Sequence, residues 1–94
     1  MVEFEWDAGK ASLNFATDGV SFAEPMTVFG DPLELTIPDP LHSAAEARFV
    51  SSGLSEVGRF LIVAYAERGR RIRIISARQA TPRERRQYES KPQT

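Results

Sequence analysis

Hydrophobic residues in the second half of the chain fall in short runs bounded by turn residues, a pattern that predicts β-strands. Two runs cover residues 48–54 and 60–66, and the connection between them contains Gly58, as in a β-hairpin. The second run begins with six consecutive apolar residues and is typical of a central strand. Residues 71–77 alternate between arginine and isoleucine at their start and predict a third strand.

The first half of the chain begins with a predicted short strand at residues 4–6, followed by a helix over residues 8–17. Asp7 is a suitable N-cap, because its side chain can accept a hydrogen bond from the first helical turn. Asp18-Gly19 is expected to end the helix, with glycine in the left-handed conformation. The apolar face of this helix is predicted to consist of Ala8, Ala11 and Phe15.

A second helix is predicted over residues 21–29, because Ser21 and Glu24 have the spacing of a capping box. Pro25 weakens this prediction, since it would occupy the fourth helical position, where proline becomes costly. Residues 33–37 alternate strictly between apolar and polar, and this alternation predicts a half-buried strand.

The C-terminal helix has the clearest boundary signal in the chain. Thr81 is the expected N-cap, Pro82 fits the first helical position, and Glu84 completes a capping box. The helix is predicted to run to about Tyr88, and residues 89–94 are expected to be a disordered tail. Residues 38–47, between the predicted strands at residues 33–37 and 48–54, are predicted to form a long polar loop.

The predicted order of elements indicates an α+β fold, with an antiparallel-rich sheet of four or five strands. Two helices precede most of the strands, one follows them, and the helices are expected to cover one face of the sheet. With 94 residues the chain is expected to form a single domain over residues 1–94.

Composition excludes several classes of protein. The chain has no cysteine and one histidine, so a disulfide framework, a thiolate metal site and a multi-histidine zinc site are excluded. The sequence shows no phosphate-binding glycine loop and no nucleophile elbow, and we expect no cofactor and no metal ion. No signal peptide is recognisable, and no apolar run approaches the ~18 residues of a membrane span. We therefore expect a cytoplasmic protein without a membrane partner.

Charge is divided unevenly along the chain. Residues 1–47 contain one of the twelve Lys and Arg residues and nine of the thirteen Asp and Glu residues, and residues 48–94 contain the rest. All but two of the basic residues are arginine, the side chain best suited to bidentate contacts with phosphate. One hypothesis is a surface that binds a polyanion such as RNA. The alternative is that the two halves neutralise each other through ion pairs in the fold.

Arginines are concentrated within residues 68–86, and this concentration is the main candidate for chemistry. The cluster comprises Arg68, Arg70, Arg71, Arg73, Arg78, Arg83, Arg85 and Arg86. Such a cluster could hold a phosphodiester and stabilise the charge that develops during RNA cleavage by the 2′-hydroxyl group, without a metal ion. Candidates for proton transfer are Lys10, His42, Glu67, Glu84 and Tyr88. Each also has a structural interpretation, which for Glu84 is the helix cap.

The sequence resembles the BrnT toxins in segments that run through nearly the whole chain. In the N-terminal part these are Phe4-Glu5-Trp6-Asp7 with Lys10 and Asn14, Gly19-Val20-Ser21-Phe22, and Val28-Phe29-Gly30-Asp31-Pro32. Asp39-Pro40, His42-Ser43, Glu46, Arg48 and Gly53-Leu54-Ser55 follow. The most specific stretch is residues 71–81, followed by Arg83-Glu84-Arg85-Arg86 and Tyr88.

This resemblance implies a RelE-like fold and a metal-independent endoribonuclease that inhibits translation as the toxin of a type II toxin–antitoxin system. It also implies a cognate BrnA-like antitoxin with a ribbon-helix-helix portion, through which the toxin meets operator DNA. The implied catalytic residues are Arg73, Arg78, Arg85 and Arg86, with Lys10 and Glu84. The residues expected to bind RNA are Arg68, Arg70, Arg71, Arg83 and Tyr88.

Two departures from the pattern leave the activity open. Thr17-Asp18 stands where relatives usually have Lys-His, so a cationic pair is replaced by a hydroxyl group and an anion. Pro25 stands in a segment where relatives tend to have helix formers. The alternative to an active ribonuclease is therefore a catalytically decayed protein that serves only as antitoxin partner and operon corepressor. A third interpretation is a sequence-tolerant RNA-binding module.

Overall fold

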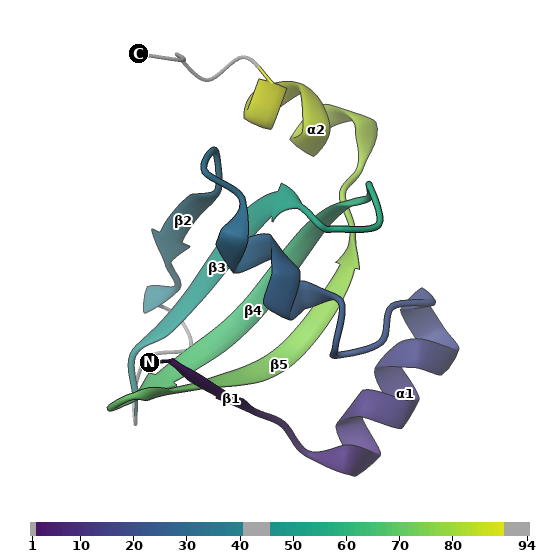
Figure 1. The fold of residues 1–94 in the computed structure, drawn as a ribbon. Coiled ribbons are helices and arrows are strands. Elements are labelled where there is room, and N and C mark those ends of the chain that lie inside the picture. The colour runs from purple at the N-terminus through teal and green to yellow at the C-terminus, as the bar shows by residue number, and fades with distance from the viewer. Residues whose placement is uncertain (1, 41–45, 90–94) are drawn as a thin grey trace.

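The computed structural model describes residues 2–40 and 46–89, which fold into a five-stranded sheet with three helical segments (Figure 1). His42 lies outside the described residues, as do the expected tail residues after Glu89. In chain order the elements are β1 (Glu3–Glu5), α1 (Ala8–Asp18), the 3₁₀ helix η1 (Pro25–Gly30), β2 (Leu35–Pro38), β3 (Arg48–Leu54), β4 (Phe60–Arg68), β5 (Arg71–Gln79) and α2 (Pro82–Glu89).

The sheet has the strand order β1-β5-β4-β3-β2, so the N-terminal strand lies beside the last one. β1 pairs with β5 in parallel, with Glu3 opposite Arg71, whereas all other neighbouring strands are antiparallel. The α+β class and the antiparallel-rich sheet of four or five strands are confirmed, and the sheet has five. β4 is central, as its apolar run predicted.

One face of the sheet carries the hydrophobic core. Its buried side chains come from the central strands and from the segment after α1: Val20, Phe22, Val28, Leu61, Val63, Tyr65, Ile74 and Ala77. α1 and η1 pack on this face, with η1 crossing over β3 and β4 (Figure 1). Since neighbouring residues of a strand point to opposite faces, Val50, Ser52 and Ile62 lie on the other face.

Asn14 joins α1 to the edge of β5. Its side-chain amide donates to the carbonyl oxygen of Ala77 at 2.8 Å and accepts from the N–H of Ala77 at 3.1 Å. The amide also donates to the carbonyl oxygen of Val20 at 2.9 Å. β1 pairs with β5 only as far as Arg73, and the Asn14 amide therefore supplies a backbone-like partner where the neighbouring strand has ended.

The structure corrects the predicted buried face of the first helix. Phe15 is 60% exposed and Ala8 is exposed as well, whereas α1 turns Ala11, as predicted, and Asn14 toward the sheet. These two residues are three positions apart and lie on one helical face. The helix boundaries agree with prediction: the Asp7 side chain accepts from the Lys10 N–H, and Gly19 ends the helix with φ of 70°.

The predicted second α-helix is wrong, because the structure has a short 3₁₀ helix that begins at Pro25. Proline is tolerated in the first turn, where its missing N–H has no helical partner. The Glu24 side chain makes no helix cap, and it pairs with Arg59 and accepts from the Ser55 hydroxyl group at 2.8 Å. The strand predicted at residues 33–37 begins later, at Leu35.

The expectation that all helices cover one face is also wrong. α2 lies beside the end of β3 and the start of β4, and three of its side chains line a groove whose floor is the opposite face of the sheet. The Tyr88 ring packs edge-on against Phe60, and its hydroxyl group donates to Asp31. Asp31 also accepts from the Leu54 N–H at 2.8 Å, so one carboxylate fixes α2 to the end of β3.

Candidate functional site

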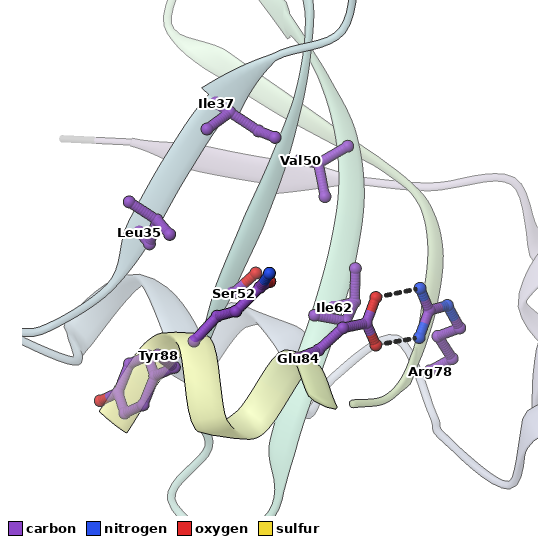
Figure 2. Close-up of a pocket in the computed structure, with 9 residues that line it drawn as sticks. Leu35, Ile37, Val50, Ser52, Ile62, Arg78, Glu84 and Tyr88 are labelled. Atoms are coloured by element: carbon purple, nitrogen blue, oxygen red, sulfur yellow. Dashed lines mark hydrogen bonds and ion pairs between the residues drawn. The ribbon is translucent and has the colours of Figure 1, made fainter. Parts of the chain in front are cut away.

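The face of the sheet that lies opposite the core contains a groove of about 210 Å³ (Figure 2). Its walls are β2 and α2, and its floor is formed by β3 and β4. The lining residues are Leu35, Ile37, Val50, Ser52, Ile62, Arg78, Glu84, Gln87 and Tyr88. This surface, called the open-face groove below, combines an aliphatic floor with a single pair of opposite charges.

That pair is Arg78 and Glu84, which come from β5 and from the first turn of α2 (Figure 2). Both terminal nitrogens of Arg78 donate to the Glu84 carboxylate, each at 2.8 Å. Glu84 also accepts from the Thr81 N–H at 2.9 Å, while the Thr81 hydroxyl group accepts from the Glu84 N–H at 3.2 Å. The predicted capping box is therefore confirmed, and the same carboxylate binds an arginine.

The pairing changes the titration of both groups. The hydrogen bonds from Arg78, with a smaller contribution from Thr81, lower the pKa of Glu84 to about 2. The pKa of Arg78 is raised, chiefly by Glu84 and further by the negative charge of Asp18. At neutral pH Glu84 is an anion that can accept a proton, and its basicity is weak while Arg78 holds it.

The end of α1 lies near this site, close enough for the charge of Asp18 to act on Arg78. A shallow hollow between α1 and β5 is lined by Lys10, Leu13, Asn14, Thr17, Asp18, Ile75 and Ser76. The structure thus brings Lys10 together with Thr17-Asp18, the pair that departs from the family pattern. Because the charge of Asp18 acts on Arg78, the departure falls within the electrostatic reach of the candidate site.

The arginines of α2 have different surroundings. Arg85 lies over the Phe60 ring, 4.5 Å from its centre, and pairs with Glu89 at 3.3 Å. Arg83 and Arg86 are exposed and three positions apart, so they share a helical face. Neither has an ion pair within residues 2–40 and 46–89. They form a free cationic surface beside the Arg78 and Glu84 pair.

Three other predicted arginines, Arg68, Arg71 and Arg73, lie near the other end of β5 in an ion-paired cluster. This cluster consists of Glu3, Glu5, Glu46, Arg48, Arg68, Arg71 and Arg73. Arg73 donates to Glu5 at 2.8 Å, and Arg68 donates to Glu46 at 2.6 Å. The pKa values of Glu5 and Glu46 are lowered by these arginine hydrogen bonds. Neutralisation by the acidic half, the alternative raised by the sequence, therefore accounts for part of the arginine content.

The structure does not bring all the predicted catalytic arginines together. Arg73 lies opposite Ala66 and Arg78 lies opposite Ile62, four residues apart along β4, which corresponds to about 13 Å. Arg70 is exposed in the turn between β4 and β5 and has no ion pair with a described residue. The candidate site is therefore centred on Arg78 and Glu84, with the ion-paired cluster as a separate region.

Two further predicted residues have clear structural positions. Tyr88 is 8% exposed, and burial together with its hydrogen bond to Asp31 raises its pKa to about 12. Because so little of the ring is exposed, Tyr88 has little surface for the predicted contact with RNA. Glu67 is exposed at the end of β4, and its N–H donates to the carbonyl oxygen of Ala47 at 3.0 Å.

Sequence reasoning missed the aliphatic part of the groove, formed by Leu35, Ile37, Val50 and Ile62. A signal was available, because the uninterrupted apolar run of β4 places apolar side chains on both faces of the sheet. An apolar second face is expected to be covered, whereas the predicted helices cover only the first. Within the described residues, no three potential ligands among His, Cys, Asp and Glu gather as a metal site. No helix among them is long and apolar enough to cross a membrane.

Comparisons with known proteins identify a family from the sequence and a shared fold from a solved structure. The family model described as "Ribonuclease toxin, BrnT, of type II toxin-antitoxin system" matches residues 6–84. The crystal structure of the Brucella abortus ribonuclease toxin BrnT matches with a TM-score of 0.67 at 21% sequence identity. The match covers 86% of this chain and 99% of that one, and at this identity it shows a common fold. No curated protein sequence matches the chain.

Proposed function

We propose that this chain, which belongs to the BrnT family of ribonuclease toxins of type II toxin–antitoxin systems, is a metal-independent endoribonuclease. Cleavage of cellular RNA would inhibit translation in the cytoplasm. The observation that carries the proposal is the bidentate pair of Arg78 and Glu84 at the open-face groove. It offers a phosphate-binding fork and a carboxylate in direct contact with each other.

The proposed reaction begins with an exchange of partners at Arg78. A phosphodiester presents the same two-oxygen geometry as a carboxylate, so it can replace Glu84 on the guanidinium group. Glu84 keeps its hydrogen bonds to Thr81, and the helix cap survives the exchange. Loss of the Arg78 hydrogen bonds removes the largest cause of the low pKa of Glu84. The carboxylate then becomes a stronger base at the moment when RNA is bound.

Cleavage follows by attack within the RNA. The 2′-oxygen forms a bond to the neighbouring phosphorus while its proton passes to Glu84, and the bond from phosphorus to the 5′-oxygen breaks. The products are a 2′,3′-cyclic phosphate and a 5′-hydroxyl group, whose oxygen takes its proton from water. Arg78 stabilises the charge that builds on the phosphoryl oxygens, supported by Arg86 and Arg85 on α2 and by Lys10 on α1.

The rest of the arginines are assigned to RNA binding. Arg83 extends the free cationic surface of α2, and Arg70 adds an exposed charge at the far turn. Arg68, Arg71 and Arg73 would contact the RNA backbone after exchange of their glutamate partners, and the contribution of Arg73 to cleavage would be to hold the RNA strand that passes through the site at Arg78. The BrnA-like antitoxin, with its ribbon-helix-helix portion, would neutralise the toxin and connect it to operator DNA.

A second candidate function is that of a decayed toxin which only binds the antitoxin and acts as corepressor. The position of Asp18 favours it, since this anion competes with phosphate for Arg78. The two candidates differ in RNA cleavage and share partner binding.

Induced expression in a bacterial host separates them. Wild type should arrest growth and degrade cellular RNA, and Arg78→Ala and Arg73→Ala should do neither. Arg59→Ala is the matched control, because it also removes an arginine from an ion pair, with Glu24, outside the site. Growth without RNA loss in cells that contain folded wild-type protein would favour the corepressor.

A further inference from the structure

The open-face groove leaves an aliphatic strip uncovered. Its residues are Leu35, Ile37, Val50 and Ile62, of which Leu35 is 36% and Ile37 is 54% exposed. Val50 and Ile62 are half-buried on the central part of the sheet. A sheet face that meets water usually carries polar residues at such positions. A strip of this kind beside a short edge strand is a surface that another chain can cover.

Positive charge borders the strip along α2. Arg78 lies in the groove itself, and Arg83, Arg85 and Arg86 follow on α2, against Glu84 and Glu89. At the other end of β5 the ion-paired cluster contains four arginines and three glutamates, and Asp39 lies beside Arg48, so the charges balance there. The excess of arginine is therefore on the α2 border, and an occupant with apolar residues beside acidic ones would complement the surface.

The chemistry of the groove floor favours a polypeptide over a nucleobase. Single-stranded RNA is held by stacking of its bases on aromatic rings or on arginine planes. Here the floor is aliphatic, and the one aromatic lining residue, Tyr88, has its ring against Phe60 and its hydroxyl group on Asp31. Leucine, isoleucine and valine pack well against similar side chains of a partner.

We propose that the open-face groove is the docking site for an acidic, amphipathic segment of the cognate antitoxin. This inference rests on the proposed function, which supplies the partner. Aliphatic side chains of the segment cover Leu35, Ile37, Val50 and Ile62. A carboxylate of the segment replaces Glu84 on Arg78, and Glu84 retains the Thr81 cap. Antitoxin and RNA phosphate then compete for the same guanidinium group, so binding in the groove blocks cleavage directly.

The test measures binding of the purified toxin to the antitoxin encoded beside it, by titration calorimetry. Ile37→Asp and Leu35→Asp place a charge on the strip at exposed positions of an edge strand, where folding tolerates it. Val57→Asp is the matched control, because Val57 is 70% exposed and does not line the groove. Both strip variants should lose roughly tenfold or more in affinity, and the control should bind like wild type. Thermal unfolding confirms that each variant is folded.

Wild-type affinity in both folded strip variants would overturn the inference. It would also be overturned if these variants kept antitoxin binding but lost RNA binding, since the groove would then be an RNA site. RNA cleavage by the free strip variants is measured in parallel. Failure of the ribonuclease proposal would appear as no cleavage by wild type, and the calorimetric comparison would still decide where the partner docks.

Discussion

Arg78 and Glu84 hold each other through two hydrogen bonds of 2.8 Å at the edge of the open-face groove. Both side chains remain partly accessible, with 46% of Arg78 and 31% of Glu84 exposed. An exposed ion pair adds little net stability, so exchange of Glu84 for another anion on Arg78 costs little free energy. The pair therefore suits a site at which phosphate and carboxylate compete.

The Glu84 pKa predicts how stability depends on pH. Its folded value of about 2 lies below the unfolded value of 4.5, so the contribution is complete above pH 4.5 and is lost as pH falls toward 2. Glu84→Gln keeps the capping residue and should lose about 1 kcal/mol of unfolding free energy at pH 7 and almost none at pH 2. Urea unfolding at several pH values measures this. An equal loss at both pH values would show that the charge pair contributes nothing.

Asn14 is predicted to be a major determinant of stability. Asn14→Leu removes the amide that serves Ala77 twice and Val20 once, and it leaves these buried backbone groups without partners. We expect a loss of about 2–4 kcal/mol in unfolding free energy, measured by urea denaturation. Ser12→Ala on the exposed face of α1 is the control and should change stability by less than about 0.5 kcal/mol. A leucine variant as stable as this control would contradict the assigned role.

Asp18 is predicted to restrain activity through its charge. Asp18→Asn removes an anion that acts on Arg78 and should raise the rate of RNA cleavage roughly fivefold at low salt. The gain should shrink as salt is added, because screening weakens the interaction. Glu56→Gln, at an exposed position in the turn after β3, controls for the general effect of net charge. An unchanged or lower rate for Asp18→Asn would place Asp18 outside the site.

Much of the fold could be predicted because its signals are local. The capping residues Asp7 and Thr81 and the glycine after α1 mark helix ends by their own hydrogen bonds or backbone conformation. The apolar run of β4 indicates its central place. Phe15 was misassigned because helical spacing shows which residues share a face and does not show which face the sheet will cover.

The candidate site was only partly predictable, since it depends on long-range register. The sequence indicated that Arg73 lies in a strand over residues 71–77 and that Arg78 directly follows it, but their partners Glu5 and Glu84 come from elements at opposite ends of the chain. The contact of Glu24 with Arg59, which replaces the expected helix cap, also spans distant segments. Such pairings become visible only when the strand order is known.

The central claim is tested most directly with purified toxin and a short RNA, in the presence of EDTA. A matched RNA carries 2′-deoxy nucleotides at the cleaved positions. The account predicts that wild type cuts the RNA to products with a 2′,3′-cyclic phosphate and a 5′-hydroxyl end, that the 2′-deoxy strand stays intact, and that Arg78→Ala cuts neither. Cleavage of the 2′-deoxy strand, a requirement for added metal, or full activity of folded Arg78→Ala would contradict it.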